Sequence, residues 1–506
     1  MKLGELLEGV PSLEIGADAA RNVTSLAYDS RLVEAGTLFF AIQGEKADGH
    51  NYIPQALDRG AVAIVSERPA PAELTARWVQ VAKIRRALSE AARIFYGHPD
   101  ARLQLVGITG TNGKTTTAFL LESVFRASGV LAGLFGTIEY RLGGRTLSAL
   151  NTTPESLDLL AYFAELVKAG GSAAVLEASS HALAQERLWG FHFAAALFTN
   201  LTRDHLDYHK DFENYFAAKR RLFEGLGTPP PELAVINADD PWAARLLEVP
   251  NPRRITYGFN SGAQVKVKQF QQNLSGLRAT LETPEGYFDV ESSLVGRANL
   301  ANILAATATA LGLGIAREKI QEGIAGLAAV PGRFERIDES QPFLVVVDYA
   351  HTDDALRNVL KTARELAAPS SGALIVVFGC GGDRDRTKRP LMGEAAGSLS
   401  DLAVLTSDNP RTEDPILIMN DALVGLQRTG KPYVLEVDRE AAIRKAFVEA
   451  REGDVVVLAG KGHETYQILK ERTIPFDDRE VARRMLRELG FSSEAVAGQR
   501  GTPARR

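Results

Sequence analysis

The chain has 506 residues, a formal net charge of −5 and a single cysteine, Cys380. The slightly negative net charge does not predict a basic surface for nucleic acid. A single cysteine cannot form an intrachain disulfide. No stretch reaches the roughly 18 consecutive apolar residues that a membrane span needs. The N-terminus also lacks a signal-peptide pattern. We therefore expect a cytoplasmic protein of several domains, with no nucleic-acid partner and no membrane span.

The first segment, residues 1–98, contains short apolar strands followed by a helix. The apolar stretches at 36–44 and 61–67 predict strands, and residues 85–97 have a helical pattern that ends at "HPDA". This segment is predicted to be an N-terminal α/β domain.

The second segment, residues 99–332, is dominated by continuous apolar runs. Such runs are typical of parallel strands that are covered on both faces. The turn "PEGYF" separates two further strands, and the helix at 298–314 closes the segment. The runs that predict parallel strands are 103–109, 172–179, 194–201 and 232–240.

The third segment, residues 333–490, alternates strands and helices again, which predicts a second parallel sheet with Rossmann-like organisation. The tail, residues 491–506, is small, polar and basic, and is predicted to be disordered. Three α/β domains are therefore expected. The apolar runs that predict strands in the third segment are 343–350, 373–380, 402–408 and 454–462.

The stretch "VGITGTNGKTTTAFLLESV" places a glycine loop between a strand and a helix. Gly110 and Gly113 allow close approach of the backbone to phosphate, and Lys114 can reach the terminal phosphates. The Thr115 hydroxyl can reach Mg²⁺. The first glycine of the common P-loop pattern is replaced by Ile108, which argues against an ordinary kinase or motor loop but not against a nucleotide. The loop predicts a central ATP-binding domain.

Two further side chains lie at the ends of two predicted strands that follow one another along the chain. Glu177 lies at the end of one strand, and "TNLTRDHLDYH" brings His205 to the same edge. Open α/β sheets build their sites at this edge, and a carboxylate there can hold Mg²⁺. A lone carboxylate at a strand end is more often structural, so Glu177 by itself carries little weight.

"GITGTNGKTTT" resembles the ATP loop of the Mur ligases, the ATP-dependent amino-acid-adding enzymes of peptidoglycan synthesis, and the resemblance extends over residues 1 to about 490. In this family the motif around Asp348 usually continues to a proline, which Asp353 replaces here. By resemblance, the ATP contacts are Gly110, Thr111, Asn112, Gly113, Lys114, Thr115, Thr116, Asn302, Arg333, Asp348 and His351.

The resemblance also implies a metal site. Glu177 and His205 are implied as Mg²⁺ ligands beside Thr115, and Lys219, in "FAAKRRLF", as a lysine carbamylated by CO₂. A bare ammonium would repel Mg²⁺, whereas a carbamate supplies the anionic oxygen that Mg²⁺ prefers. Lys114, Glu177, His205 and Lys219 are the implied catalytic residues.

The segments "AYDSRLVEAGTLFFAIQGEKADGHNYI", "NTTPES" and "SSHALAQER" resemble family members that extend UDP-N-acetylmuramoyl-L-alanyl-D-glutamate. Residues 1–98 would then be the domain that binds the UDP-N-acetylmuramoyl group. The implied contacts to this substrate are Ser30, Glu45, Lys46, Ala47, Asn151, Thr152, Thr153, Ser179, Gln185 and Arg187.

"DNPR", residues 408–411, follows a predicted strand and resembles the motif of members that add meso-diaminopimelate; lysine-adding relatives generally lack the arginine. Diaminopimelate carries a second carboxylate, which a guanidinium can hold with two parallel hydrogen bonds. Residues 333–490 would form the amino-acid-binding domain. The implied acceptor contacts are Arg389, Asp408, Asn409, Pro410, Arg411, Gly460 and Glu464.

The resemblance therefore implies a monomeric, ADP-forming ligase that joins meso-diaminopimelate to the D-glutamyl γ-carboxylate through an acyl-phosphate. The alternative is the same step with L-lysine as acceptor. A folylpolyglutamate synthase shares the ATP loop, but the DNPR and GKGHE loops disfavour it. A kinase or motor would need glycine at 108 and a Walker B strand, and a non-enzymatic interaction protein would not need three sets of charged loops at strand ends.

Overall fold

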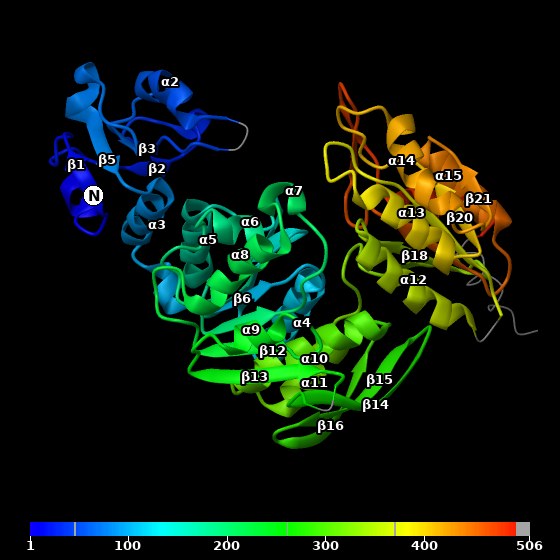
Figure 1. The fold of residues 1–506 in the computed structure, drawn as a ribbon. Coiled ribbons are helices and arrows are strands. Elements are labelled where there is room, and N and C mark those ends of the chain that lie inside the picture. Colours follow the sequence, from blue (N-terminus) through cyan, green and yellow to red (C-terminus); the bar gives the residue numbers. More distant parts are fainter. Residues whose placement is uncertain (45–46, 261, 369–370, 492–506) are drawn as a thin grey trace, which may run out of the picture.

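The computed structural model describes residues 1–44, 47–260, 262–368 and 371–491. Three bodies follow one another along the chain, with the central one between the N-terminal and C-terminal ones (Figure 1). In the part of the chain that is described, no helix has the length and apolar character needed to cross a membrane. The predicted α/β class, with mostly parallel sheets, is confirmed.

The N-terminal body contains a five-stranded sheet of order β1-β5-β4-β3-β2, in which only β1 runs antiparallel to its neighbour. Both strands and the helix predicted in residues 1–98 are present, as β3, β4 and α3. Its elements are α1 (Leu3–Leu7), β1 (Ser12–Ile15), β2 (Ser25–Ala27), η1 (Ser30–Leu32), β3 (Thr37–Phe40), η2 (Gly49–Tyr52), α2 (Ile53–Asp58), β4 (Ala63–Ser66), η3 (Ala72–Arg77), β5 (Trp78–Val81), α3 (Ile84–Phe95) and η4 (Pro99–Arg102).

The central body is built on an eleven-stranded sheet of order β16-β15-β14-β13-β12-β11-β6-β10-β7-β8-β9. The strands from β14 to β7 are parallel, and antiparallel hairpins extend the sheet at both ends. Its elements are β6 (Gln104–Thr109), α4 (Lys114–Ala127), β7 (Ala132–Phe135), β8 (Glu139–Leu142), β9 (Arg145–Ser148), α5 (Ser156–Lys168), β10 (Ala173–Glu177), α6 (Ser180–Ala184), β11 (Ala195–Phe198), α7 (Leu206–His209), α8 (Phe212–Glu224), β12 (Leu233–Asn237), α9 (Ala243–Leu247), β13 (Arg253–Gly258), β14 (Val265–Asn273), β15 (Gly276–Thr283), β16 (Gly286–Ser292), α10 (Arg297–Gly312) and α11 (Arg317–Ala325).

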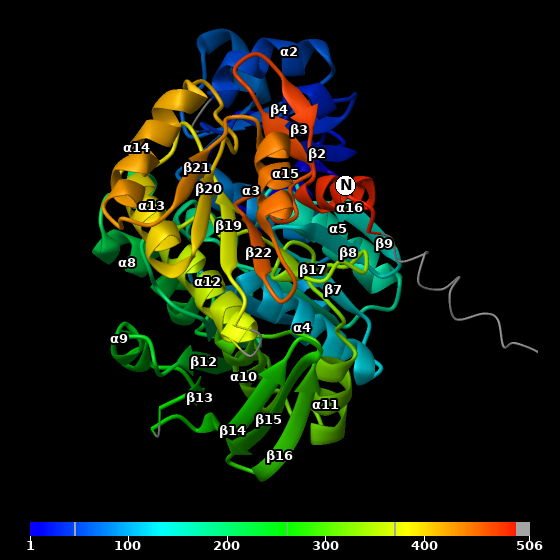
Figure 2. The same cartoon turned by 90° about the vertical axis from the view of Figure 1, so that its right-hand side faces the viewer.

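The strand order of the central sheet positions the glycine loop. This loop leaves β6, whose two neighbours are β10 and β11, and all three strands are parallel. The side chains that follow the carboxyl ends of these strands therefore gather around the loop. The antiparallel strands β14 to β16 form the arm at the far end of the sheet (Figure 2).

The C-terminal body has a six-stranded sheet of order β17-β18-β22-β19-β20-β21 and a separate hairpin, β23–β24. Phe491, its last described residue, packs edge-on against Phe343, with ring centres 5.8 Å apart. Residues 492–506 of the predicted tail lie outside the described residues. The elements are β17 (Glu335–Ile337), β18 (Leu344–Asp348), α12 (Asp353–Ala367), β19 (Leu374–Phe378), α13 (Lys388–Leu399), β20 (Leu402–Leu405), α14 (Pro415–Gln427), β21 (Tyr433–Leu435), α15 (Arg439–Glu449), β22 (Val455–Ala459), β23 (Tyr466–Ile468), β24 (Thr473–Pro475) and α16 (Asp478–Glu488).

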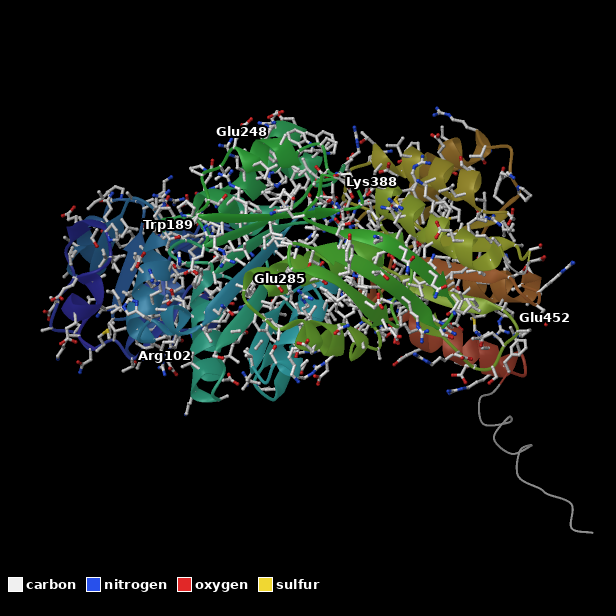
Figure 3. The ribbon with its side chains drawn as sticks, turned by 90° about the horizontal axis from the view of Figure 1, so that it is seen from below. Arg102, Trp189, Glu248, Glu285, Lys388 and Glu452 are labelled. Atoms are coloured by element: carbon white, nitrogen blue, oxygen red, sulfur yellow. The ribbon has the colours of Figure 1, made fainter. Side chains whose placement is uncertain are left out.

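Polar and cation–π contacts join the N-terminal and central bodies. The guanidinium of Arg86, on α3, lies 3.7 Å from the ring centre of Trp189 and forms two hydrogen bonds with Glu186, at 2.8 and 2.7 Å. Tyr28 donates a 2.6 Å hydrogen bond to Asp158 of α5. Figure 3 shows Trp189 where the blue N-terminal body meets the green central body. These contacts fix the N-terminal body beside α5 and α6.

A buried ion pair should dominate the polar contribution to the stability of the C-terminal body. Arg439 holds both carboxylate oxygens of Asp478, at 2.8 and 2.6 Å, and neither side chain is exposed. Removing one partner leaves a buried charge, so Arg439→Met should lower the free energy of unfolding by about 3–5 kcal/mol. Chemical denaturation measures this value.

The control for this prediction is an exposed pair on the same two helices. Arg484 and Glu440 are 2.7 Å apart but about half exposed, and such pairs contribute only about 0–1 kcal/mol. Arg484→Met should therefore change stability little, and the double variant Arg439→Met/Asp478→Leu should recover much of the loss. Equal effects of Arg439→Met and Arg484→Met would contradict the prediction.

Candidate active site

A cavity of about 920 Å³ lies between the central and C-terminal bodies. The glycine loop, the ends of β10 and β11 and the start of α10 form its central-body wall, and the residues after β18 form the opposite wall. Lys388, which lies near this junction, is visible in Figure 3. The site residues predicted from sequence that line the cavity are Gly110 to Thr116, Thr152, Glu177, Ser179, His205, Lys219, Asn302, Arg333, Asp348 and His351.

The glycine loop has the shape of an anion site. Gly113 is the N-cap of α4 with φ of 88°, and a Cβ atom at this position would lie 2.4 Å from Oδ1 of Asn302. The Lys114 ammonium donates to the carbonyl oxygens of Gly110 and Thr111, at 3.0 and 2.8 Å. Burial lowers the pKa of Lys114, and the charge of Glu177 opposes this shift. Free backbone N–H groups at the start of α4 and this ammonium point to phosphate binding.

Lys219 reaches the same loop from α8. Its ammonium is almost fully buried, donates to the Gly110 carbonyl oxygen at 2.7 Å and lies 4.4 Å from the ring centre of Tyr215. Burial lowers the pKa of Lys219 well below its ordinary value, and the charge of Lys114 lowers it further. A neutral amine is the form that can attack CO₂. Two lysines thus meet at one carbonyl oxygen.

Glu177 ends β10 with its side chain almost fully buried. Its two carboxylate oxygens accept hydrogen bonds from the backbone N–H and the hydroxyl of Thr137, at 2.9 and 3.0 Å. The Glu177 carbonyl oxygen accepts a 2.6 Å hydrogen bond from Thr153. The carboxylate is therefore held in one orientation at the edge of the cavity.

His205 follows β11 in a left-handed backbone conformation, with φ of 52°. The side chain of His205 is 45% exposed; partial desolvation lowers its pKa, although the neighbouring Asp204 opposes this shift. The imidazole is then neutral at neutral pH, which is the form that binds metal ions. No group of three or more His, Cys, Asp or Glu side chains that could hold a metal ion occurs among the described residues.

The C-terminal body contributes a cation and an acid to the cavity. Arg333 donates to the Thr115 hydroxyl at 3.3 Å and lies over the ring of Tyr349. Asp348 accepts from the backbone N–H of Phe334 at 2.7 Å, and burial raises its pKa. His351 binds the Tyr349 carbonyl oxygen through Nδ1 at 2.8 Å. These contacts bring the glycine loop and the C-terminal wall together.

A second cavity of about 520 Å³ adjoins the first and shares Thr137, Thr152 and Tyr349 with it. Thr152 and the loop that contains Glu464 both line this second cavity. The Arg187 guanidinium supports this wall because it donates to the Thr153 carbonyl oxygen at 2.8 Å. The predicted residues that line the second cavity are Asn151, Thr152 and Glu464.

The other residues that were predicted to contact the UDP-N-acetylmuramoyl substrate are spread more widely. Thr153 accepts from the Ser179 N–H at 3.0 Å, and Gln185 accepts from Arg187 at 2.8 Å. Ser30 is buried in the N-terminal body and donates to Gln55 at 2.8 Å. Ala47 is exposed, whereas Glu45 and Lys46 lie outside the described residues. Their predicted roles remain predictions.

The predicted acceptor loops are held together by a buried lysine. The Lys461 ammonium lies 3.3 Å from the Asn409 amide oxygen, 3.2 Å from Glu464 and 3.6 Å from Asp408. Asn409 also donates to Glu464 at 2.8 Å. Gly460 approaches closely: a Cβ there would lie 2.9 Å from the Asp408 carboxylate. The DNPR and GKGHE loops therefore form one structural unit.

Two arginines differ in their surroundings. Arg411 has φ of 52° and donates to the Gly382 carbonyl oxygen at 2.7 Å, next to Pro410. Arg389 is fully buried, and its guanidinium binds Glu413 at 2.7 Å and Asp421 at 2.9 Å. In this arrangement Arg389 holds the loop through two carboxylates, whereas Arg411 donates to the carbonyl oxygens of Gly382 and Asn409 and could exchange them for a carboxylate.

Several cavity residues were not predicted from the sequence. Arg297 lies over the ring of Phe259, 3.8 Å from its centre, and both line the cavity with Asn237 and Asp239. Phe259 follows β13, so its position just beyond a strand end was the signal that could have identified it. Thr137, which holds Glu177, was also not predicted.

Three family models match the chain in order. The Mur ligase family catalytic domain matches residues 22–96, the Mur ligase middle domain residues 108–310, and the Mur ligase glutamate ligase domain residues 332–462. The chain belongs to the Mur ligase family. The predicted family and the predicted ligase class are thereby confirmed.

Similar Mur ligases cover nearly the whole chain. The UDP-N-acetylmuramoyl-L-alanyl-D-glutamate–2,6-diaminopimelate ligase of Solibacter usitatus is 57% identical over 97% of this chain and 99% of its own. The protein of the same name from Geobacter metallireducens is 46% identical over 98% and 100%. A solved structure with that enzyme name has 35% identity and a TM-score of 0.68, covering 97% of this chain and 99% of its own.

A more distant Mur ligase shows the shared fold. The MurF ligase of Thermotoga maritima, solved in complex with ADP, has 21% identity and a TM-score of 0.61, covering 95% of this chain and 99% of its own. At this level of identity, the match supports the three-body architecture alone.

Proposed function

We propose that the protein joins meso-diaminopimelate to the D-glutamyl γ-carboxylate of UDP-N-acetylmuramoyl-L-alanyl-D-glutamate, with cleavage of ATP to ADP and phosphate, in peptidoglycan precursor synthesis. The observation that carries this proposal is the junction of the two cavities at Thr137, Thr152 and Tyr349. A phosphate-binding loop faces one cavity, and the GKGHE loop faces the other. The names of the similar proteins support the same substrates.

The residues present fit Mg²⁺ if Lys219 is carbamylated. Thr115 and Glu177 offer oxygen ligands and His205 a neutral nitrogen, but an ammonium at Lys219 would oppose the metal charge. When the neutral Lys219 amine attacks CO₂, one N–C bond forms, one C=O π pair moves to oxygen and the nitrogen releases a proton, which leaves an anionic carbamate oxygen as a ligand. Bound Mg²⁺ would supply stabilisation of the negative charge on the transferred phosphoryl group.

The chemistry then follows from positioning. A γ-carboxylate oxygen of the D-glutamyl group attacks the γ-phosphorus of ATP, and the bond to ADP breaks, which gives an acyl-phosphate. Lys114 and Arg333 stabilise charge that develops on the phosphoryl oxygens. The amine of diaminopimelate attacks the acyl carbon, phosphate leaves from the tetrahedral intermediate, and the amine gives up a proton. Closure of the C-terminal body would bring Arg411 towards this centre.

Acceptor choice should depend on Arg411. A charge-assisted bidentate pair is worth about 1.5–3 kcal/mol, and leaving a buried partner unpaired costs more. Arg411→Ala should therefore lower kcat/KM for meso-diaminopimelate roughly 10- to 1000-fold at about 1.4 kcal/mol per tenfold. The kcat/KM for L-lysine, which lacks the second carboxylate, should fall much less or rise.

The measurement compares kcat/KM for both acceptors in the wild type and in Arg411→Ala. Arg428→Ala is the matched control, because Arg428 is an exposed arginine of the same body that lies at the end of α14, outside the DNPR and GKGHE loops. If the ratio of kcat/KM for diaminopimelate to kcat/KM for lysine is unchanged in Arg411→Ala, Arg411 does not bind the second carboxylate. A wild type that prefers lysine would replace the proposed acceptor with the alternative.

A further inference from the structure

We propose that Thr137 is a positioning residue of this ligase: it orients the Glu177 carboxylate for the metal–nucleotide complex and connects it to the substrate-side loop at Thr152. This inference rests on the function proposed above. Thr137 follows β7 by two residues, far in sequence from both of its partners, and the fold brings the three side chains together at the carboxyl ends of β7 and β10.

One residue holds both oxygens of the Glu177 carboxylate. The Thr137 N–H donates to Oε1 at 2.9 Å and the Thr137 hydroxyl donates to Oε2 at 3.0 Å. The preceding residue, Gly136, makes room for this contact, since a Cβ atom there would lie 2.3 Å from Oε1 of Glu177. The turn at 136–137 therefore forms a cradle with the shape of the carboxylate.

The direction of the hydrogen bonds follows from the number of protons. A threonine hydroxyl has one proton, and the oxygens of a carboxylate can only accept. Thr137 uses its proton on Glu177, so Thr152 must be the donor in the 3.2 Å contact between the two hydroxyl oxygens. A chain of donors thus runs from Thr152 through Thr137 to Glu177, and each bond polarises the next.

The position of this chain matches the place where the substrates must meet. Thr137 and Thr152 line both cavities, whereas Glu177 lines the cavity of the glycine loop. A substrate oxygen that accepts the Thr152 proton competes with Thr137 for it. A substrate bound in the second cavity therefore changes the hydrogen bonding of the Glu177 carboxylate through the hydroxyl groups of Thr152 and Thr137.

The test measures metal-dependent nucleotide binding. The Mg²⁺ concentration at half-saturation is determined by calorimetry with a non-hydrolysable ATP analogue. Loss of a partner that orients a ligating carboxylate typically costs roughly 10- to 100-fold in metal affinity. Thr137→Val keeps the shape but loses the hydroxyl, so its half-saturation should rise by about that factor, while Thr137→Ser should restore most of the affinity.

Thr280→Val is the matched control. The Thr280 hydroxyl also donates to a carboxylate, Asp289 at 2.7 Å, but in the β15–β16 hairpin. This variant should have the wild-type Mg²⁺ dependence. Thr152→Val should have a smaller effect than Thr137→Val, and none when added to it, because the chain is already broken.

Gly136→Ala provides a second route, because its added methyl group must displace the end of the Glu177 side chain rather than the backbone. It should also raise the Mg²⁺ requirement, and circular dichroism checks that each variant is folded. Wild-type Mg²⁺ dependence in folded Thr137→Val and Gly136→Ala overturns the inference. Failure of the wild type to form the diaminopimelate product would instead overturn the proposed function and leave the Mg²⁺ titrations interpretable.

Discussion

Lys219→Ala is expected to lower kcat roughly 100- to 1000-fold, because the variant cannot form the carbamate that compensates the charge of Mg²⁺. A metal ion contributes several kcal/mol to a phosphoryl-transfer transition state, and a loss of about 3–4 kcal/mol corresponds to this range. The structure provides the reason for modification: the amine is buried, its pKa is lowered by burial and by Lys114, and it contacts the Gly110 carbonyl oxygen and the Tyr215 ring. Steady-state assays with all three substrates measure the loss.

Chemical rescue distinguishes a missing ligand from a damaged fold. Acetate or formate should partly restore Lys219→Ala, since a small carboxylate can replace the carbamate oxygens. Wild-type enzyme kept free of CO₂ should lose activity and regain it with bicarbonate. Arg220→Ala, a change at the next residue of α8, is the control and should need no rescue. Retention of most activity by Lys219→Ala would end the carbamate hypothesis.

The sequence predicted those parts of the fold that depend on local pattern. Apolar runs such as 172–179 and 194–201 became β10 and β11, because parallel strands covered on both faces need no polar alternation. The strands β8 and β9, at one end of the central sheet, were not predicted. Only β8 alternates clearly between buried and half-buried residues, and β9 is mostly exposed, so the pattern that identifies a strand is weak there.

Site residues that lie at strand ends could be predicted from the sequence. Residues whose role depends on a contact with a side chain far away in the sequence could not. Glu177 ends β10 and His205 follows β11, the two parallel strands on either side of β6, and the fold brings both residues to the first cavity. Arg389 lies in a charged loop in the sequence, yet it is buried against Glu413 and Asp421, which are 24 and 32 residues away. The spacing of residues in the sequence does not reveal ion pairs between such distant side chains. Thr137 was not predicted for the same reason, because its partner Glu177 is 40 residues away.

Lys114→Ala should lower kcat/KM by roughly 1000-fold or more, similar to the loss of a cation that stabilises a phosphoryl-transfer transition state elsewhere. The ammonium lies at the N-terminus of α4, where its charge adds to the free N–H groups of the first turn. The fold should survive, because the ammonium contacts two carbonyl oxygens of its own loop rather than the apolar core. Single-turnover assays measure the chemical step, and thermal unfolding measures stability.

The controls for Lys114→Ala test whether the effect is specific to this lysine and to its positive charge. Lys168→Ala removes an exposed lysine at the end of α5 and should leave both rate and stability near wild type. Acetate should not rescue Lys114→Ala, because that variant lacks a cation, whereas Lys219→Ala lacks an anion. The opposite responses of two lysines that share the Gly110 carbonyl oxygen would show that one acts as an ammonium and the other as a carbamate. Near-normal turnover in folded Lys114→Ala would remove the glycine loop from the nucleotide site.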